Sequence, residues 1–173
     1  MPHILTVDVE DWFHTQALSQ SLTPDAWEEY PVRIHSNLSR LLELFQRHQT
    51  KATFFVLGWV AEKFPELVEL ILEAGHEIAS HGYAHQLIYN QSQEDLRVDL
   101  WKNLEILERI AGVKVLGYRA PSFFIRDGYS WVFLKLNELG IRYDSSIFPI
   151  WHGLYGIPSA PAFPFRLSCR RMK

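Results

Sequence analysis

Short apolar runs alternate with helical patterns along most of this chain. The runs predict strands because they are rich in β-branched and aromatic residues, as in Lys51–Gly58. The intervening segments predict amphipathic helices because their apolar residues recur at helical spacing, as Ile34, Leu38 and Leu41 do. We therefore predict strands at residues 4–9, 51–58, 76–80, 114–118 and 141–144. We predict helices at residues 34–45, 65–72, 96–112 and 129–139.

This alternation argues for parallel βαβ units, so the predicted fold class is α/β. The polar residues of interest fall just after predicted strands. In α/β folds and barrels, functional sites lie at those carboxyl ends of the strands. After Asp144 the alternation fails, because residues 145–173 contain four prolines and no clear strand or helix.

Composition narrows the class of protein. A chain of 173 residues fits one domain, and its 47% hydrophobic content allows a sizeable core. The formal net charge of −3 gives no reason to expect nucleic acid or an anionic membrane surface as a partner. The single cysteine, Cys169, excludes an intrachain disulfide and a cysteine-rich zinc site.

We see no signal-peptide pattern and no apolar run near the roughly 20 residues of a membrane span, so we expect a cytoplasmic protein.

Three carboxylates, Asp8, Glu10 and Asp11, follow the first predicted strand. Such a cluster is repulsive unless a cation or solvent lies between its members. Asp8 and Glu10 share a face if the strand continues, because side chains alternate along a strand. Taken alone, the cluster is equally compatible with a solvated acidic loop.

Two histidines four positions apart, His81 and His85, follow the third predicted strand. A pair at this spacing can meet one metal ion from a helical turn or a tight loop, although chance pairs of surface histidines are common. Arg119 follows the fourth strand, where it is either an ordinary surface arginine or an orienting partner for a buried carboxylate. Two imidazoles and one carboxylate supply three ligands and leave a position open for water, as hydrolytic metal sites require.

In this order, the motifs resemble those of the polysaccharide deacetylases, the NodB-homology proteins of carbohydrate esterase family 4. The resemblance covers nearly the whole chain. Residues 8–13, 143–149 and 155–158 are most similar to a bacterial branch associated with exosortase and exopolysaccharide gene clusters. The segments that carry the resemblance are Thr6–Asp11, Ser80–His85 and Arg119–Ser122, supported by Lys51–Phe55 and Ala74–Ile78.

The resemblance implies a distorted (β/α) barrel of the NodB type that holds a divalent metal, most often Zn²⁺. Asp8 matches the catalytic base, and Arg119 matches the arginine that orients it. His81 and His85 match the metal-binding histidines.

The metal carboxylate is the point where this sequence departs from the family. The commonest pattern has two adjacent aspartates, whereas Val9 follows Asp8 here. A branch with one residue between the two acids places the ligand at Glu10, which strand alternation also favours. Asp11 remains the alternative.

The implied activity is removal of N-acetyl groups from an N-acetylhexosamine-containing polysaccharide or oligosaccharide by metal-activated water. Residues in the motif loops are the candidates for substrate contact. Aromatic side chains there can stack on sugar rings, and a backbone N–H near Ser122 can face the oxyanion. The candidates are Trp12, Pro121, Ser122 and Phe123.

One family feature is missing. The family usually protonates the leaving amine from a histidine in a late Leu-x-x-His-type motif, and the only histidine beyond Asp144 is His152, which we read as a loop residue. We therefore expect a single domain over residues 1–173 that lacks the last strands, a barrel incomplete at its C-terminus. Two alternatives stay open: a cyclic-amide hydrolase of the same superfamily and a non-catalytic metal- or glycan-binding remnant.

Overall fold

Five parallel strands form one sheet in the order β1-β2-β3-β4-β5, which confirms the predicted α/β class. The computed structural model describes residues 3–19, 21–123, 125, 128–152 and 155–167, so Cys169 lies outside the described part. Neighbours in sequence are neighbours in the sheet, as in the wall of a (β/α) barrel. Among the described strands, the first and the last are the edges of the sheet. The strands are β1 (Thr6–Val9), β2 (Thr53–Val56), β3 (Glu77–Ser80), β4 (Gly117–Tyr118) and β5 (Tyr143–Asp144).

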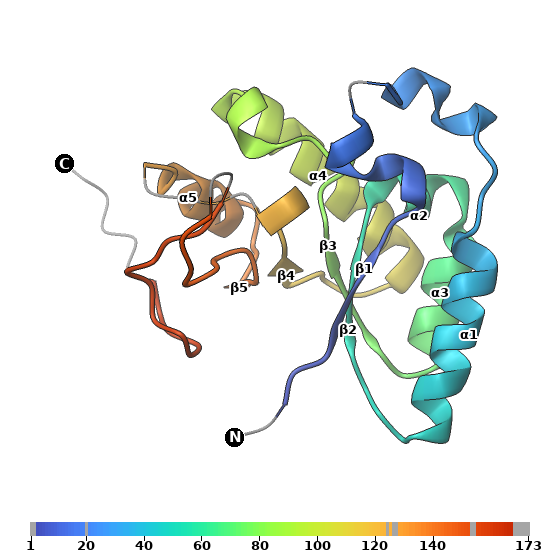
Figure 1. Cartoon of the computed structure of the whole chain (residues 1–173). Helices are drawn as coiled ribbons and strands as arrows, with labels where there is room; N and C mark the ends of the chain where they lie inside the picture. The colour runs from blue at the N-terminus through green and yellow to red at the C-terminus, as the bar shows by residue number, and fades with distance from the viewer. Residues whose placement is uncertain (1–2, 20, 124, 126–127, 153–154, 168–173) are drawn as a thin grey trace.

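Helices connect the strands and cover the sheet. In Figure 1, α1 and α3 lie side by side, and these two helices are in contact. The long helix α4 contacts α2, α3 and α5, so it holds the helical layer together. The helices are α1 (Ile34–Arg47), α2 (Gly58–Lys63), α3 (Pro65–Glu73), α4 (Gln93–Ala111) and α5 (Trp131–Glu138).

Strand β2 lies between β1 and β3 and forms the centre of the core. Its Phe54, Phe55 and Val56 are at most 1% exposed, as expected for a strand covered on both faces. Apolar side chains of the helices close the core above it, among them Ile71 of α3 and Leu100 of α4, both fully buried. Burial of this apolar surface is the main stabilising contribution to the fold.

Several predicted boundaries differ from the observed ones. The strand predicted for residues 141–144, for example, is only Tyr143–Asp144, and two larger differences follow. The strand predicted for residues 51–58 ends at Val56, and Gly58 begins the unpredicted helix α2. A side chain at Gly58 would collide with Tyr83 and Asn103, so only glycine allows this close approach. The strand predicted for residues 114–118 is reduced to the two residues of β4.

The remaining segments hold short 3₁₀ helices. One of them, Pro24–Glu29, lies within the residues that join β1 to α1, and another, Trp12–His14, directly follows the acidic cluster. After β5 the described residues form neither strand nor helix, as predicted. Within the described part of the chain, no helix has the length and apolar character needed to cross a membrane.

Candidate metal centre

Three side chains from the ends of β1 and β3 converge on one point. Glu10 directly follows β1, His81 directly follows β3, and His85 lies four residues further on. One potential ligand atom from each lies within 4.8 Å of the other two. Both imidazoles are buried, and the Glu10 side chain is 28% exposed. The parallel sheet brings these groups together because its carboxyl ends meet at one edge.

The contact between Glu10 and His85 is close but lacks the geometry of a hydrogen bond. Oε2 of Glu10 lies 2.9 Å from Nε2 of His85, yet this buried oxygen has no hydrogen-bond partner among the described residues. Burial raises the pKa of the Glu10 carboxyl, but the adjacent His85, with smaller effects from His81 and His14, lowers that pKa more, so the net shift is downward. A carboxylate oxygen and an imidazole nitrogen that face one point in this way are typical of two ligands to one cation.

His81 is held in the tautomer that a metal ligand needs. Its Nδ1 lies 2.8 Å from the backbone carbonyl of Arg119, which can only accept, so Nδ1 carries the proton and Nε2 carries the lone pair. Burial lowers the pKa of His81, which favours the neutral imidazole. A backbone carbonyl in this position is the usual outer partner of a metal-binding histidine.

Asp11 is engaged elsewhere. Its Oδ1 accepts a hydrogen bond from Trp12 N at 2.9 Å, and its Oδ2 accepts from Arg33 N at 2.7 Å and Ile34 N at 3.0 Å. The carboxylate thus caps the 3₁₀ helix after β1 and contacts the start of α1. Of the two carboxylates that the sequence left open, the geometry favours Glu10 as the ligand.

This donor set fits a divalent metal such as zinc. Two imidazoles and one carboxylate match a three-ligand catalytic zinc site, which keeps a further position for water or substrate. Oε2 of Glu10 is buried and receives no hydrogen bond among the described residues, and it faces the His85 nitrogen at 2.9 Å. This is the observation that argues for a bound cation, because such an oxygen is otherwise costly to bury.

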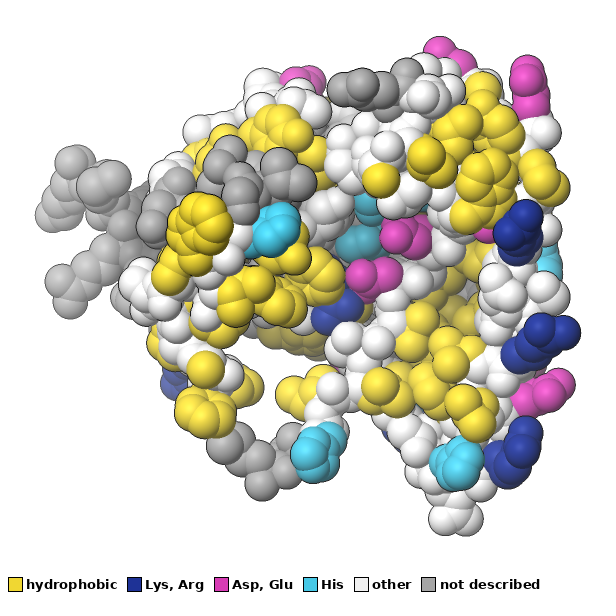
Figure 2. Space-filling view, in the orientation of Figure 1, with side chains coloured by type: hydrophobic (Ala, Val, Ile, Leu, Met, Phe, Trp, Pro, Cys, Tyr) yellow, Lys and Arg dark blue, Asp and Glu magenta, His cyan; other side chains and the backbone are white. Residues whose placement is uncertain are grey.

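Asp8 and Arg119 form an ion pair beside the three ligands. Arg119 Nη1 donates to Asp8 Oδ1 at 2.7 Å, and the Asp8 side chain is 25% exposed, so water can reach it. Figure 2 shows acidic, basic and histidine side chains gathered in a hollow of this face, between hydrophobic surfaces. The pairing predicted between an arginine after the fourth strand and a carboxylate after the first is present.

Contacts on every side fix the guanidinium of Arg119. Its Nη2 donates to Thr6 Oγ1 at 2.9 Å and to Ser145 Oγ at 2.8 Å, and its Nε donates to the Ser145 carbonyl at 3.3 Å. The ring of Phe55 lies 4.1 Å from Cζ of Arg119. A planar guanidinium held in this way orients the carboxylate that it contacts.

The loop that carries both histidines is held by two polar side chains of α4 that sequence reasoning missed. Asp99 accepts from the backbone N–H groups of Tyr83 at 2.8 Å and Ala84 at 3.1 Å. Asn103 donates to the carbonyls of Val56 at 3.2 Å and Gly82 at 2.8 Å. In the sequence, these two polar residues are four positions apart and interrupt the apolar pattern that predicts the buried face of α4.

These contacts hold His85 in an unfavourable backbone conformation. His85 has φ 51°, in the left-handed region that side chains other than glycine seldom adopt. Such a conformation persists only where surrounding contacts impose it.

A further missed group lies after β5. Ser146 Oγ accepts from Ala120 N at 2.8 Å and donates to Asp144 Oδ1 at 2.6 Å. Burial raises the pKa of Asp144 to about 6, against the lowering effect of its hydrogen bonds with Ser146. This group ties β5 to the residue that follows Arg119.

The predicted substrate residues lie in two places. The centre of the Phe123 ring lies 4.9 Å from Cζ of Arg119, and Pro121, two residues before Phe123, is buried. Ser122 and Phe123 have φ near 54°, so the turn after Arg119 is tight. Trp12 packs on Phe13 and donates through its indole nitrogen to the Pro31 carbonyl at 3.1 Å, within the connection to α1.

The late histidine lies outside the regular elements. His152 is exposed in the segment after β5, as predicted, and its ring stacks on Tyr155 at 4.1 Å between centroids.

Comparisons with known proteins identify the family that this chain resembles. Residues 20–143 match the family model described as polysaccharide deacetylase. A peptidoglycan-N-acetylglucosamine deacetylase of Bacillus cereus is 39% identical over 82 residues, which are 47% of this chain and 30% of that protein. A peptidoglycan deacetylase of Helicobacter pylori is 34% identical over 118 residues, which are 64% of this chain and 36% of that protein.

A solved structure with a similar fold is also assigned to this family. The crystal structure of a Mycobacterium smegmatis protein assigned as a polysaccharide deacetylase has a TM-score of 0.68 and 31% sequence identity, over 83% of this chain and 50% of that chain. The present chain spans about a third of the length of the two curated relatives.

Proposed function

This chain belongs to the polysaccharide deacetylase family, and we propose that it removes acetyl groups from N-acetylhexosamine units of a glycan with the help of a divalent metal. The observation that carries the proposal is the convergence of Glu10, His81 and His85 beside the Asp8–Arg119 pair. This arrangement combines a ligand set for a Lewis acid with a solvent-accessible carboxylate, which metal-assisted hydrolysis of an amide requires.

Zinc is the metal that we propose. The ligand set of two imidazole nitrogens and one carboxylate oxygen is one that zinc uses in hydrolases. When bound, such an ion polarises the acetamide carbonyl and makes water easier to deprotonate. Glu10, His81 and His85 would hold it.

In the proposed mechanism, Asp8 is the general base. Its carboxylate takes the proton of the attacking water, and the hydrogen bond from Arg119 Nη1 keeps it in one orientation. Because Arg119 is itself held by Thr6 and Ser145, the base does not have to be ordered when substrate arrives. The backbone N–H of Ser122, in the tight turn after Arg119, would donate to the oxyanion that forms on the acetyl oxygen. When the C–N bond breaks, the leaving amine would take the proton that Asp8 received from the water.

We propose an N-acetylated polysaccharide of the exopolysaccharide class as the natural substrate. The support is the resemblance of the first motif, Asp8–Phe13, to the branch that accompanies exopolysaccharide gene clusters. The curated relatives described above act, by their names, on peptidoglycan. Both polymers present the same reacting group, an acetamide on a hexosamine ring.

The experiment is an assay of acetate release from N-acetylglucosamine oligomers by the zinc-loaded chain. Asp8→Asn should lower the rate by roughly 10²- to 10⁴-fold, the usual contribution of a positioned base, while one zinc per chain is retained. Asp25→Asn, at an exposed acid in the connection to α1, is the matched control and should keep the rate.

Two other outcomes would each replace the proposed function, and a third would change its mechanism. Ring opening of a cyclic ureide without acetate release would indicate the cyclic-amide hydrolase. Tight zinc binding with no turnover of either substrate would indicate a non-catalytic metal- or glycan-binding role. Full acetate release by Asp8→Asn would remove Asp8 from the mechanism.

A further inference from the structure

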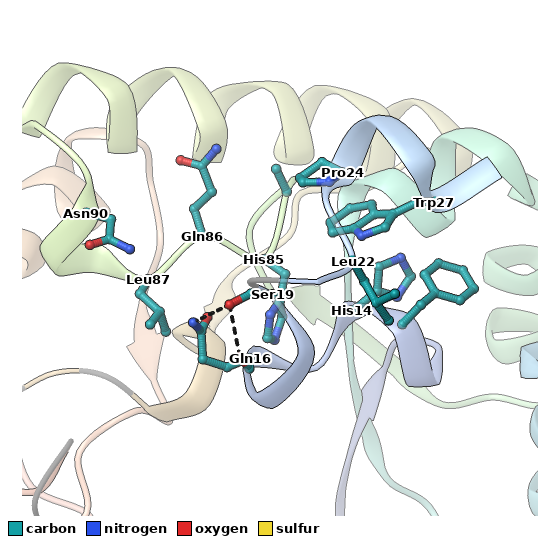
Figure 3. Close-up of a pocket in the computed structure, with 12 residues that line it drawn as sticks. His14, Gln16, Ser19, Leu22, Pro24, Trp27, His85, Gln86, Leu87 and Asn90 are labelled. Atoms are coloured by element: carbon teal, nitrogen blue, oxygen red, sulfur yellow. Dashed lines mark hydrogen bonds between the residues drawn. The ribbon is translucent and has the colours of Figure 1, made fainter. Parts of the chain in front are cut away.

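His14 is a buried histidine four residues after Glu10, and it is neither a proposed ligand nor the proposed base. It ends the 3₁₀ helix that follows the acidic cluster. In Figure 3, His14 lies on the segment after β1, and the metal ligand His85 lies on the loop after β3. A buried polar ring that binds no metal needs another reason for its place in the fold.

The imidazole of His14 holds the peptide bond that follows Glu10. Its Nδ1 accepts a hydrogen bond at 2.8 Å from Asp11 N, which is the nitrogen of the Glu10–Asp11 peptide. In return, His14 N donates to the Asp11 carbonyl at 3.0 Å, so a pair of hydrogen bonds joins the two residues. Because a backbone N–H can only donate, this contact requires a neutral ring with its lone pair on Nδ1.

Glu10 is thus held from both sides along the chain. Before it, Val9 is paired with β2, and its carbonyl accepts from Leu57 N at 3.3 Å. After Val9 the chain leaves the sheet, and the hydrogen bond from Asp11 N to His14 anchors the backbone on the other side of Glu10. A rotation of the Glu10–Asp11 peptide would move the carboxylate away from the imidazoles, and this hydrogen bond opposes that rotation.

Aromatic neighbours fix the ring of His14 in turn. Its centroid lies 4.4 Å from those of Phe13 and Trp27 and 5.1 Å from that of Trp59. All three neighbours are at most 8% exposed. Trp59 belongs to α2, and its backbone N–H donates to the Tyr83 carbonyl at 3.0 Å, in the loop that carries both metal-binding histidines. The packing of His14 therefore joins the segment that carries Glu10 to the helix that holds the histidine loop.

We propose that His14 is a positioning residue of the metal centre, which fixes the Glu10–Asp11 peptide and thereby places the Glu10 carboxylate opposite the two imidazoles. The inference rests on the metal site of the proposed function, but not on the reaction that the bound metal supports. The alternative is a role in packing alone. The two roles predict different orders for two substitutions of nearly equal size.

The test compares His14→Asn with His14→Leu. Asparagine and leucine have nearly the same size and shape, but only asparagine keeps an acceptor, its Oδ1, near the place of Nδ1. If His14 only packs, leucine should serve at least as well, because its surroundings are aromatic. If His14 positions Glu10, asparagine should be the better replacement, because the Asp11 N–H keeps its partner.

The readouts are titration with Co²⁺, whose visible absorption spectrum reports the number and geometry of its ligands, and competition for Zn²⁺ with a chromophoric chelator. His14→Leu should bind both metals about 10- to 100-fold more weakly, the usual effect of losing a contact that orients a ligand, and should alter the Co²⁺ spectrum. His14→Asn should keep the affinity and the spectrum close to those of the unsubstituted chain. Ile71→Val, in the buried core of α3, is the control for a loss of stability alone and should change neither.

Two results would overturn the proposal. One is metal affinity in His14→Leu equal to that of the unsubstituted chain, and the other is an equal loss in His14→Leu and His14→Asn. If His14→Leu fails to fold, as judged by circular dichroism, His14→Met takes its place in the comparison. Methionine fills more of the ring's volume and also lacks a nitrogen or oxygen acceptor.

Acetate release by the unsubstituted chain separates this proposal from the proposed function. Release, with equal metal affinity in all the variants, would leave the function standing and overturn the role of His14. The predicted order of metal affinities without release would support the role of His14 and contradict the function.

Discussion

Asp99 should control metal affinity although it does not belong to the ligand set. Its two carboxylate oxygens accept from Tyr83 N and Ala84 N, directly before His85, whose backbone has φ 51°. Asp99→Asn replaces one acceptor oxygen by an NH₂ group, so one of these N–H groups loses its partner. Hydrogen bonds to charged groups contribute about 1.5–3 kcal/mol each, which is comparable to the cost of a left-handed backbone, about 1–3 kcal/mol.

The loss should therefore release the loop and lower zinc affinity. Outer contacts of metal ligands typically change affinity by about 10- to 100-fold, and we expect Asp99→Asn to fall in that range. The assay is competition with a chromophoric zinc chelator at pH 7, with the free energy of unfolding measured on the same samples.

A matched control lies on the same helix. Asp95 bonds with Ser92 at the exposed start of α4, away from the loop, so Asp95→Asn should leave zinc affinity unchanged. If Asp99→Asn bound zinc as tightly as the unsubstituted chain, or if both variants weakened it equally, the loop would not be held in the way described.

Two further predictions concern stability. Because burial raises the pKa of Asp144 from 3.8 to about 6, its contribution to stability is fully present below about pH 4 and is lost as the pH rises through 6. The stability of Asp144→Asn relative to the unsubstituted chain should therefore rise by about 3 kcal/mol between pH 4 and pH 7 in urea titrations, and a flat difference would contradict the assignment. Gly58→Ala should destabilise the fold by about 1–3 kcal/mol, because its Cβ would lie 2.7 Å from Asn103 Nδ2; a thermal midpoint equal to that of the unsubstituted chain would argue against this packing.

Much of the fold follows from local patterns. Strands β1, β2 and β3 were predictable because short apolar runs rich in β-branched residues are typical of the buried strands of a parallel sheet. Helix α4 was predictable because Gly112, with φ 68°, ends a long amphipathic segment. Helix α2 was not, because its start is decided by how closely the chain passes Tyr83, a contact distant in sequence.

The residues of the site also fall into a group that the sequence indicated and a group that only the structure reveals. That Glu10, His81 and His85 lie close together was predictable, because parallel strands have their carboxyl ends at one edge and residues that follow different strands meet there. Asp99 and Ser146 were not, because they act through backbone groups of other segments and carry no motif of their own. Only the packing of α4 and of the segment after β5 against these loops gives them a role.

The most direct measurement is zinc content by elemental analysis, with a binding titration, for the unsubstituted chain and for His81→Ala, Glu10→Gln and Asp11→Asn. We predict one zinc per unsubstituted chain, loss of tight zinc in the His81 and Glu10 variants, and retention in the Asp11 variant. One tightly held zinc in His81→Ala, or its loss in Asp11→Asn alone, would contradict a centre built from Glu10, His81 and His85.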